Sequence, residues 1–260
     1  TPIKSSAASD VYKRQILNCQ ITYKGSTSLI YSVEGKIKNC NIQTMKLNSS
    51  NSTNETLQGA FTSKLTGNME NCTATDIEII NNNTYSIHIG GLAGFIAKSE
   101  IKNCFVTGLK VNIEKGNVYV GIGGIVGYES DVSKITNCIA EGSINADGDN
   151  IGGIAGKIKV SSNIENSISK VNITGSSDVL GGIVGIKEDT VSSVINNLSL
   201  GNLYSSKNGI QGKSIIHSGT DNINNNYYYE GQKINGISVG KKDYGCLLYT
   251  SDAADDLIGV

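Results

Sequence analysis

Cysteine offers the most chemistry in this sequence. Five of the six cysteines follow an asparagine, at Asn18-Cys19, Asn39-Cys40, Asn71-Cys72, Asn103-Cys104 and Asn137-Cys138. Thiols can hold a metal ion, but the Cys-x-x-Cys spacing typical of metal sites does not occur. Side chains stacked in parallel on successive repeats could form a disulfide only by distortion. We therefore expect buried, reduced thiols, with a disulfide or a metal site as the alternatives.

Histidine and aspartate could also serve as metal ligands. His88 and His217 share no position in a repeat and have no Cys or Asp partner nearby, so we expect both to be incidental, exposed or half-buried residues. The Asp147-Gly148-Asp149-Asn150 loop carries oxygen ligands that suit calcium. The equivalent segments 115–117 and 176–178 lack the acid pair, which favours a solvated turn. We expect no metal site and no cofactor.

A catalytic site would need acids, or a base beside arginine, gathered on one face. Residues 16–245 contain no arginine and their acids are scattered, so we expect no catalytic residue and no enzyme activity in this chain. The Gly121-Ile122-Gly123-Gly124 segment does not match the spacing of a dinucleotide-binding loop. Aromatic side chains could instead stack on sugars, although core packing explains at least one of the three consecutive tyrosines; the candidates are Tyr119, Tyr128, Tyr204, Tyr227, Tyr228 and Tyr229. The binding residues and the ligand stay unknown.

The positions of these residues depend on an internal repeat. The asparagine frame recurs at intervals of about 30 residues and continues at Asn166-Ser167, Asn197-Leu198 and Asn226-Tyr227; only the interval from Asn18 to Asn39 is clearly shorter. A second motif, Gly-Gly followed by two apolar residues and Gly, keeps step with it; its copies are Gly90–Gly94, Gly123–Gly127, Gly152–Gly156 and Gly181–Gly185.

These paired motifs resemble the GLUG-motif repeats of bacterial surface proteins. That group includes adhesins and the non-catalytic N-terminal repeats of IgA1-specific metallopeptidases. The resemblance is strong over about residues 55–230 and weak over 16–54. It implies a repetitive extracellular β-structure that serves as a stalk or scaffold. The metallopeptidases carry zinc in a His-Glu-x-x-His segment, which this chain lacks, so the resemblance does not extend to their activity.

The repeat length indicates an all-β fold. Short runs of alternating polarity, broken by Gly, Asn, Ser and Asp, predict strands, and no stretch has convincing helical periodicity. We therefore predict a parallel β-helix, or β-solenoid, of seven to eight turns of about 30 residues, without substantial helix. Asparagine tolerates the left-handed backbone of a corner and can form ladders between turns. We expect the next residue, usually Cys, to point inward.

The apolar residues of the glycine motif are the expected core. We place Leu92, Ile125, Ile154 and Ile183 in the interior, although the alternation also allows the face of Ala93 and Val126. The formal net charge is −1. This near-neutral charge argues against electrostatic binding to nucleic acid or to an anionic membrane. No apolar run is long enough to predict a membrane span.

Both ends of the chain differ from the repeat. Residues 5–15 and 246–256 can be encoded by opposite strands of one DNA segment, which resembles a translated sequencing adapter. We therefore expect 1–15 and 246–260 to be non-native tails that flank a repeat region at 16–245, itself a fragment of a longer chain.

These observations lead to a functional expectation. We expect a fragment of a secreted or cell-surface bacterial repeat protein that acts as an adhesin, a structural scaffold or a stalk. Its expected partners are host glycans, host surface proteins and neighbouring repeats of the same longer chain. The alternatives are the scaffold segment of a large surface metallopeptidase and a polysaccharide-active β-helix enzyme.

Overall fold

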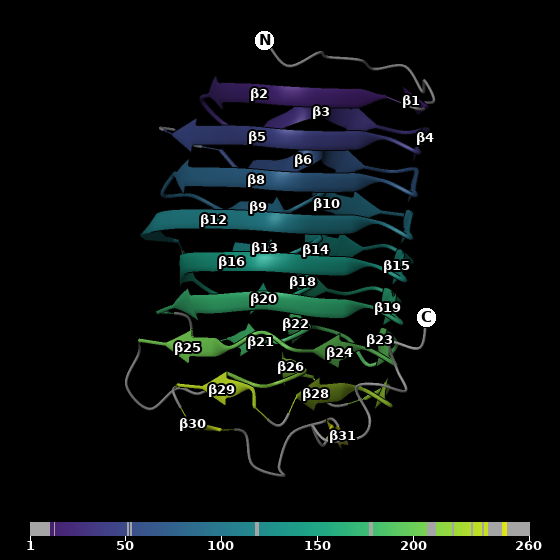
Figure 1. Cartoon of the computed structure of the whole chain (residues 1–260), viewed down its shortest axis with the longest axis vertical. Helices are drawn as coiled ribbons and strands as arrows, with labels where there is room; N and C mark the ends of the chain where they lie inside the picture. Colours follow the sequence, from purple (N-terminus) through teal and green to yellow (C-terminus); the bar gives the residue numbers. More distant parts are fainter. Residues whose placement is uncertain are drawn as a thin grey trace.

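The chain folds into a stack of short strands that wind around one elongated core (Figure 1). In this computed structural model the described residues are 11–12, 14–50, 52, 54–117, 120–176, 179–206, 212–219, 221–229, 231–235, 237–238 and 246–248. They contain strands and no helix, and nearly every strand pairs in parallel with its counterpart in the next turn. The predicted parallel β-solenoid is confirmed.

Three sheets run along the stack. The first has the shortest strands: β1 (Val11–Tyr12), β4 (Lys36–Lys38), β7 (Asn68–Glu70), β11 (Glu100–Lys102), β15 (Lys134–Thr136), β19 (Asn163–Glu165), β23 (Ser193–Ile195) and β27 (Ile223–Asn224).

The second sheet, which we call the long-strand sheet, follows the asparagine corner. It consists of β2 (Gln15–Tyr23), β5 (Asn41–Ser50), β8 (Thr73–Asn82), β12 (Phe105–Asn117), β16 (Ile139–Gly148), β20 (Ile168–Gly175), β24 (Leu198–Ser199), β25 (Leu203–Ser205), β28 (Tyr227–Tyr229), β29 (Lys233–Ile234), β30 (Ile237–Ser238) and β31 (Cys246–Leu248).

The third sheet carries the glycine motif. It consists of β3 (Thr27–Val33), β6 (Thr56–Leu65), β9 (Ile87–Gly90), β10 (Ala93–Ala97), β13 (Val120–Gly123), β14 (Val126–Ser130), β17 (Ile151–Gly152), β18 (Ala155–Ile158), β21 (Leu180–Gly181), β22 (Val184–Lys187) and β26 (Ile216–Ser218).

The solenoid has about six turns of about 31 residues, slightly fewer than the seven to eight predicted. The long strand is continuous from β2 to β20 and then breaks into the short pieces β24 and β25. The next turn is divided in the same way, into β28 and β29. The last asparagine positions therefore fall in turns that lack the regular long strand, and counting asparagines overestimates the number of regular turns.

The glycine motif forms a tight loop whose apex enters the core. Leu92, Ile125 and Ile154 at the apex are fully buried, and Ala93 beside Leu92 is also fully buried. The second glycine of the motif lies against the inner face of the long-strand sheet. A Cβ at Gly124 would lie only 2.6 Å from the Ala140 Cβ.

The last glycine of the motif brings the two arms of the loop together. A Cβ at Gly94 would lie 2.9 Å from the main-chain oxygen of His88, on the opposite arm. The sequence left open whether the face of Leu92 or the face of Ala93 points inward. Both are inside, because the backbone of the loop itself crosses the interior. This arrangement explains how a chain with 38% hydrophobic residues fills its core: glycine backbone occupies part of that space.

The predicted tails are described only in part. Val11–Tyr12 pairs with β4, and Cys246–Leu248 pairs with β28, each in parallel. Most of residues 1–15 and 246–260 lie outside the described residues, so their non-native origin stays a prediction. Within the described part of the chain, no helix is long and apolar enough to cross a membrane.

Candidate functional site

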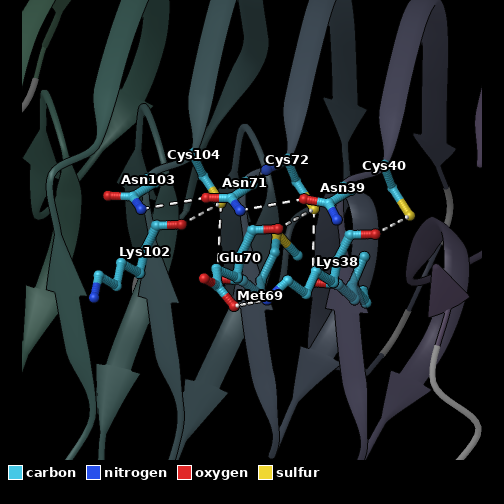
Figure 2. A network of polar contacts seen from close by, with 11 residues as sticks. Lys38, Asn39, Cys40, Met69, Glu70, Asn71, Cys72, Lys102, Asn103 and Cys104 are labelled. Atoms are coloured by element: carbon cyan, nitrogen blue, oxygen red, sulfur yellow. Dashed lines mark hydrogen bonds and ion pairs between the residues drawn. The ribbon is translucent and has the colours of Figure 1, made fainter. Parts of the chain in front are cut away.

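The asparagine corner joins the short strands to the long-strand sheet. Asn39, Asn71, Asn103 and Asn137 have φ values of 53°, 53°, 52° and 54°, in the left-handed region. In the last three of these, the amide Nδ2 donates to the asparagine Oδ1 of the preceding turn at 3.2 Å, which links Asn137 to Asn103, Asn103 to Asn71 and Asn71 to Asn39. Figure 2 shows three of these residues in line. The predicted corner and its amide ladder are confirmed for these four turns.

The first asparagine pair does not belong to this corner. Strand β2 aligns Cys19 with Met45, so Asn18 lies level with Thr44 in the middle of a strand. Both Asn18 and Thr44 have positive φ, 51° and 56°. The shorter interval between Asn18 and Asn39 reflects this different position. Cys19 is only half-buried and lies outside the thiol ladder described below.

The last two asparagine positions were predicted one residue too late. Asn196 and Asn225, with φ of 57° and 51°, occupy the corner, and the following Asn197 and Asn226 point into the core. Consecutive asparagines hid this shift in the sequence. Leu198 and Tyr227, which were expected to point inward, instead begin strands β24 and β28 as less buried residues.

The residue after the corner asparagine forms a buried polar ladder. Cys40, Cys72, Cys104 and Cys138 are buried, as predicted. Figure 2 shows the first three of them following one another along the stack, each next to its asparagine. The Cys104 thiol donates to the main-chain oxygen of Lys102 at 3.2 Å and accepts the Cys72 N–H at 3.4 Å.

Serine and asparagine replace cysteine in this ladder. Ser167 Oγ accepts the Cys138 N–H at 3.2 Å, and Asn197 Oδ1 accepts the Ser167 N–H at 2.9 Å. Asn226 Oδ1 accepts the Asn197 N–H, also at 2.9 Å. The position therefore needs a small side chain that both donates and accepts, rather than a small hydrophobic residue alone.

Burial and hydrogen bonds make the thiols of Cys40, Cys72 and Cys104 poor nucleophiles. The hydrogen bond with Cys104 and burial both raise the pKa of Cys72, and the hydrogen bond with Cys138 raises the pKa of Cys104. Burial raises the pKa of Cys40. The thiolate is the species that reacts with electrophiles and binds metals, so this ladder is suited to structure rather than to chemistry.

A second ladder, of serines, was missed by the sequence analysis. Ser99, Ser133, Ser162 and Ser192 are buried at the corner that precedes the short strands. The Ser99 N–H donates to Ser133 Oγ at 3.2 Å, and the Ser162 N–H donates to Ser192 Oγ at 2.9 Å. Each serine lies four residues before a corner asparagine, so a search for positions in phase with the asparagines would have found it.

The outer face of the short strands carries paired charges. Lys38 and Glu70 form an ion pair at 2.8 Å, and Lys134 and Glu165 form another at 2.8 Å. A shallow depression of about 210 Å³ lies over β4, β7 and β11. Lysines and glutamates line it together, so it selects no charge class of ligand.

His88 differs from its prediction as an incidental residue. Its exposed fraction is 7%, and its Nε2 lies 3.3 Å from Glu55 Oε1. The hydrogen bond from His88 lowers the pKa of Glu55. The His88 ring also contacts Tyr128, with centroids 5.1 Å apart. The expected exposed or half-buried position was wrong for His88, because it packs against Tyr128 and pairs with a glutamate in a loop that the repeat pattern did not place. His217 is half-buried, as expected.

The sugar-stacking candidates have different environments. Tyr128 is half-buried, 5.2 Å from the ring of Phe95, with the Lys157 Nζ 5.2 Å from its ring centroid. Tyr204, Tyr227 and Tyr229 are exposed, at 50%, 38% and 39%. Tyr228 is buried at 1%, which confirms that packing explains one of the three consecutive tyrosines. Tyr119 lies outside the described residues.

The remaining candidates lie apart from one another. Asp147 and Asp149 are half-buried at the end of β16, and Gly121 and Gly123 are strand residues of β13. Among the described residues, no group of three or more His, Cys, Asp or Glu side chains could hold a metal. The fully buried Glu129 was not predicted from the sequence. Its carboxyl oxygens have no hydrogen-bond partner among the described residues, and burial raises its pKa well above the ordinary value.

Comparisons with known proteins agree with this geometry. Residues 85–112, which include one glycine loop and one asparagine corner, match the family model of the GLUG motif. A crystal structure from Bacteroides ovatus, described as a “putative immunoglobulin A1 protease”, is similar to this chain with a TM-score of 0.60 and 25% identity. The similarity covers 82% of this chain and 66% of that chain, slightly less than two thirds of its length. Among curated proteins, none matches.

Proposed function

We propose that this chain is a non-catalytic β-solenoid segment of a larger secreted or cell-surface bacterial protein, and that it acts as a scaffold or adhesive stalk. The observation that carries the proposal is that side chains which could do chemistry are instead engaged in hydrogen bonds between turns. Thiols, serine hydroxyls and corner amides bond to equivalent groups or backbone in adjacent turns, which stiffens the stack. Such ladders favour a rod that holds other parts of a protein at a fixed distance.

The comparisons favour a more specific setting as the second candidate. The similar Bacteroides ovatus structure is described as a “putative immunoglobulin A1 protease”, and residues 85–112 of this chain match the GLUG motif. This chain would then be the scaffold segment of a surface protease, with catalysis elsewhere. Full-length sequence separates the two: a wall-anchor signal with further repeats supports the adhesive stalk, and a His-Glu-x-x-His domain supports the protease.

An activity assay tests the non-catalytic role directly. The purified chain is incubated with IgA1, pectin and glycosaminoglycan, with and without added zinc and calcium, and the products are followed by gel electrophoresis and mass spectrometry. We expect no cleavage of any substrate. Depolymerisation of either polysaccharide would replace the scaffold with a polysaccharide-active enzyme, and cleavage of IgA1 would place protease activity in this segment.

Labelling of intact cells tests the location. An antibody raised against the chain should stain non-permeabilised cells of the source bacterium or detect the protein in the culture medium. Staining only after permeabilisation, with none in the medium, would contradict a secreted or surface role.

A further inference from the structure

One column on the outer face of the long-strand sheet changes character along the rod. The column is the first residue of β5, β8, β12, β16, β20, β24 and β28, where the pairing register aligns Asn41, Thr73, Phe105, Ile139, Ile168, Leu198 and Tyr227. The first two are polar, and Thr73 donates to Asn41 Oδ1 at 2.7 Å. The other five are apolar or aromatic and partly open to solvent, with Phe105 and Tyr227 each 38% exposed.

The repeat itself shows that the fold does not require an apolar residue at this position. Asn41 and Thr73 begin the 10-residue strands β5 and β8, and Ile139 begins β16, which has the same length and the same parallel pairing. Cross-strand apolar contacts contribute only about 0.2–1 kcal/mol per pair. Five in succession make a strip about 19 Å long, at about 4.8 Å per turn. Contiguous apolar residues on a solvent-exposed face of a protein mark interaction sites.

The corner amides change along the same turns. From Asn39 to Asn137 the amides bond to one another. The next three corner residues, Asn166, Asn196 and Asn225, are exposed, and their amides have no hydrogen-bond partner among the described residues. Each lies two residues before a member of the apolar column. The C-terminal turns thus present an apolar column beside a row of amides that can donate and accept.

We propose that this surface, formed by Ile168, Leu198, Tyr227 and the amides of Asn166, Asn196 and Asn225, binds neutral glycan chains. A sugar ring has an apolar C–H face, which packs on tyrosine and leucine, and hydroxyl groups, which pair with amides. Lys170, two residues after Ile168 on β20, lies 4.0 Å from Glu141 on β16, so these two charges offset each other and give the surface no preference for an anion. Tyr229, 39% exposed, extends the aromatic end of the surface.

This inference rests on the adhesive form of the proposed function, and its test is separate. The purified chain is applied to an array of neutral hexose and N-acetylhexosamine oligosaccharides of increasing length. The array also carries sialylated and sulfated counterparts and an enzymatically deglycosylated glycoprotein. We expect binding to the longer neutral chains, and little preference for the anionic ones.

The decisive variants follow from the repeat. I168T/L198N/Y227T places in this column the residue types that it carries at Thr73 and Asn41. We expect this variant to keep its β-sheet circular dichroism and to lose at least about tenfold in glycan affinity, which corresponds to about 1.4 kcal/mol. N196D keeps a residue that tolerates the left-handed backbone but removes the amide donor, and it should also bind more weakly. Y85T, at a 55% exposed tyrosine outside the column, is the matched control and should bind normally.

Three results would overturn the inference. The chain binds no glycan; the folded triple variant binds as well as the parent chain; or binding goes to the deglycosylated glycoprotein, which would assign the strip to a protein partner. Should the triple variant not fold, N196D decides the question, because unchanged glycan binding by this variant would exclude a role for the amides. None of these outcomes affects the non-catalytic scaffold, which the cleavage assay tests independently.

Discussion

At the scale of single residues, this protein uses side chains that could do chemistry, above all cysteine thiols, to form hydrogen bonds. The Cys72 and Cys104 thiols have raised pKa values because each is hydrogen-bonded to the thiol of the next turn and is buried. Ser167 shows that a hydroxyl performs the same task two turns after Cys104. The regular position of the cysteines after the repeating asparagines indicated this structural role, whereas the reactivity of free thiols pointed wrongly to chemistry.

This role predicts different outcomes for two substitutions at Cys104. Cys104→Ser keeps a donor to the Lys102 oxygen and an acceptor for the Cys72 N–H, so its free energy of unfolding should stay close to that of the parent chain. Cys104→Ala leaves that N–H buried and unpaired, which should cost about 1–3 kcal/mol. Urea denaturation followed by circular dichroism measures both. Equal losses for the two variants would mean that the thiol acts only by filling space.

Glu129 predicts a pH dependence at the same scale. Burial raises its pKa above the ordinary value of 4.5, so the folded chain holds a proton that the unfolded chain releases. Stability should therefore fall as pH rises above about 4.5, by at most about 1.4 kcal/mol per pH unit, until the folded pKa is reached. The variant E129Q should lack this part of the slope, while E70Q, at an exposed ion pair, should keep it. Parallel stability profiles for E129Q and the parent chain between pH 5 and about pH 8 would contradict the prediction.

At the scale of elements, the glycine loop is the unit that sets the cross-section of the rod. Gly124 lies beside the oxygen of Gly153 and the Cβ of Ala140, both closer than a Cβ can tolerate. The loop can enter the core only because these glycines lack side chains.

Gly124→Ala should therefore destabilise the chain by about 1–3 kcal/mol, as overpacked cores do. Thermal unfolding of G124A and of G124A/A140G tests the cause. The second substitution removes the contact with Ala140 but leaves the one with the Gly153 backbone, so we expect little rescue. Full recovery in the double variant would show that the side-chain contact alone sets the constraint.

The elements also show how far sequence reasoning reached. The repeat length, the strands, the corner at Asn71 and the buried position of Cys72 followed from periodic pattern, because stacked turns must repeat the same backbone. The predicted corner was wrong at Asn18, which occupies a second left-handed position within a strand. It was one residue late at Asn196, because another asparagine follows it. The pairing of His88 with Glu55 was beyond reach, since it joins a strand to a loop that does not repeat.

At the scale of the whole molecule, stability should vary along the rod. Each turn contacts mainly its neighbours, so the stability of a solenoid is close to a sum of local terms. Strand β12 spans 13 residues and pairs on both sides with β8 and β16, whereas β24 has 2 residues. The core residues of the central turns, such as Val106 and Ile125, are fully buried.

Amide hydrogen exchange measured by mass spectrometry should therefore show a gradient. We expect the slowest exchange in β8, β12 and β16, and exchange at least about tenfold faster in β24 to β29, because fewer bonds must open together there. G124A, in the centre, should speed exchange in the adjacent turns first, while a substitution such as L203A should act on the C-terminal turns alone. Uniform exchange along the chain would show that the rod unfolds as one cooperative unit, and the C-terminal turns would then be as rigid a platform for a ligand as the centre.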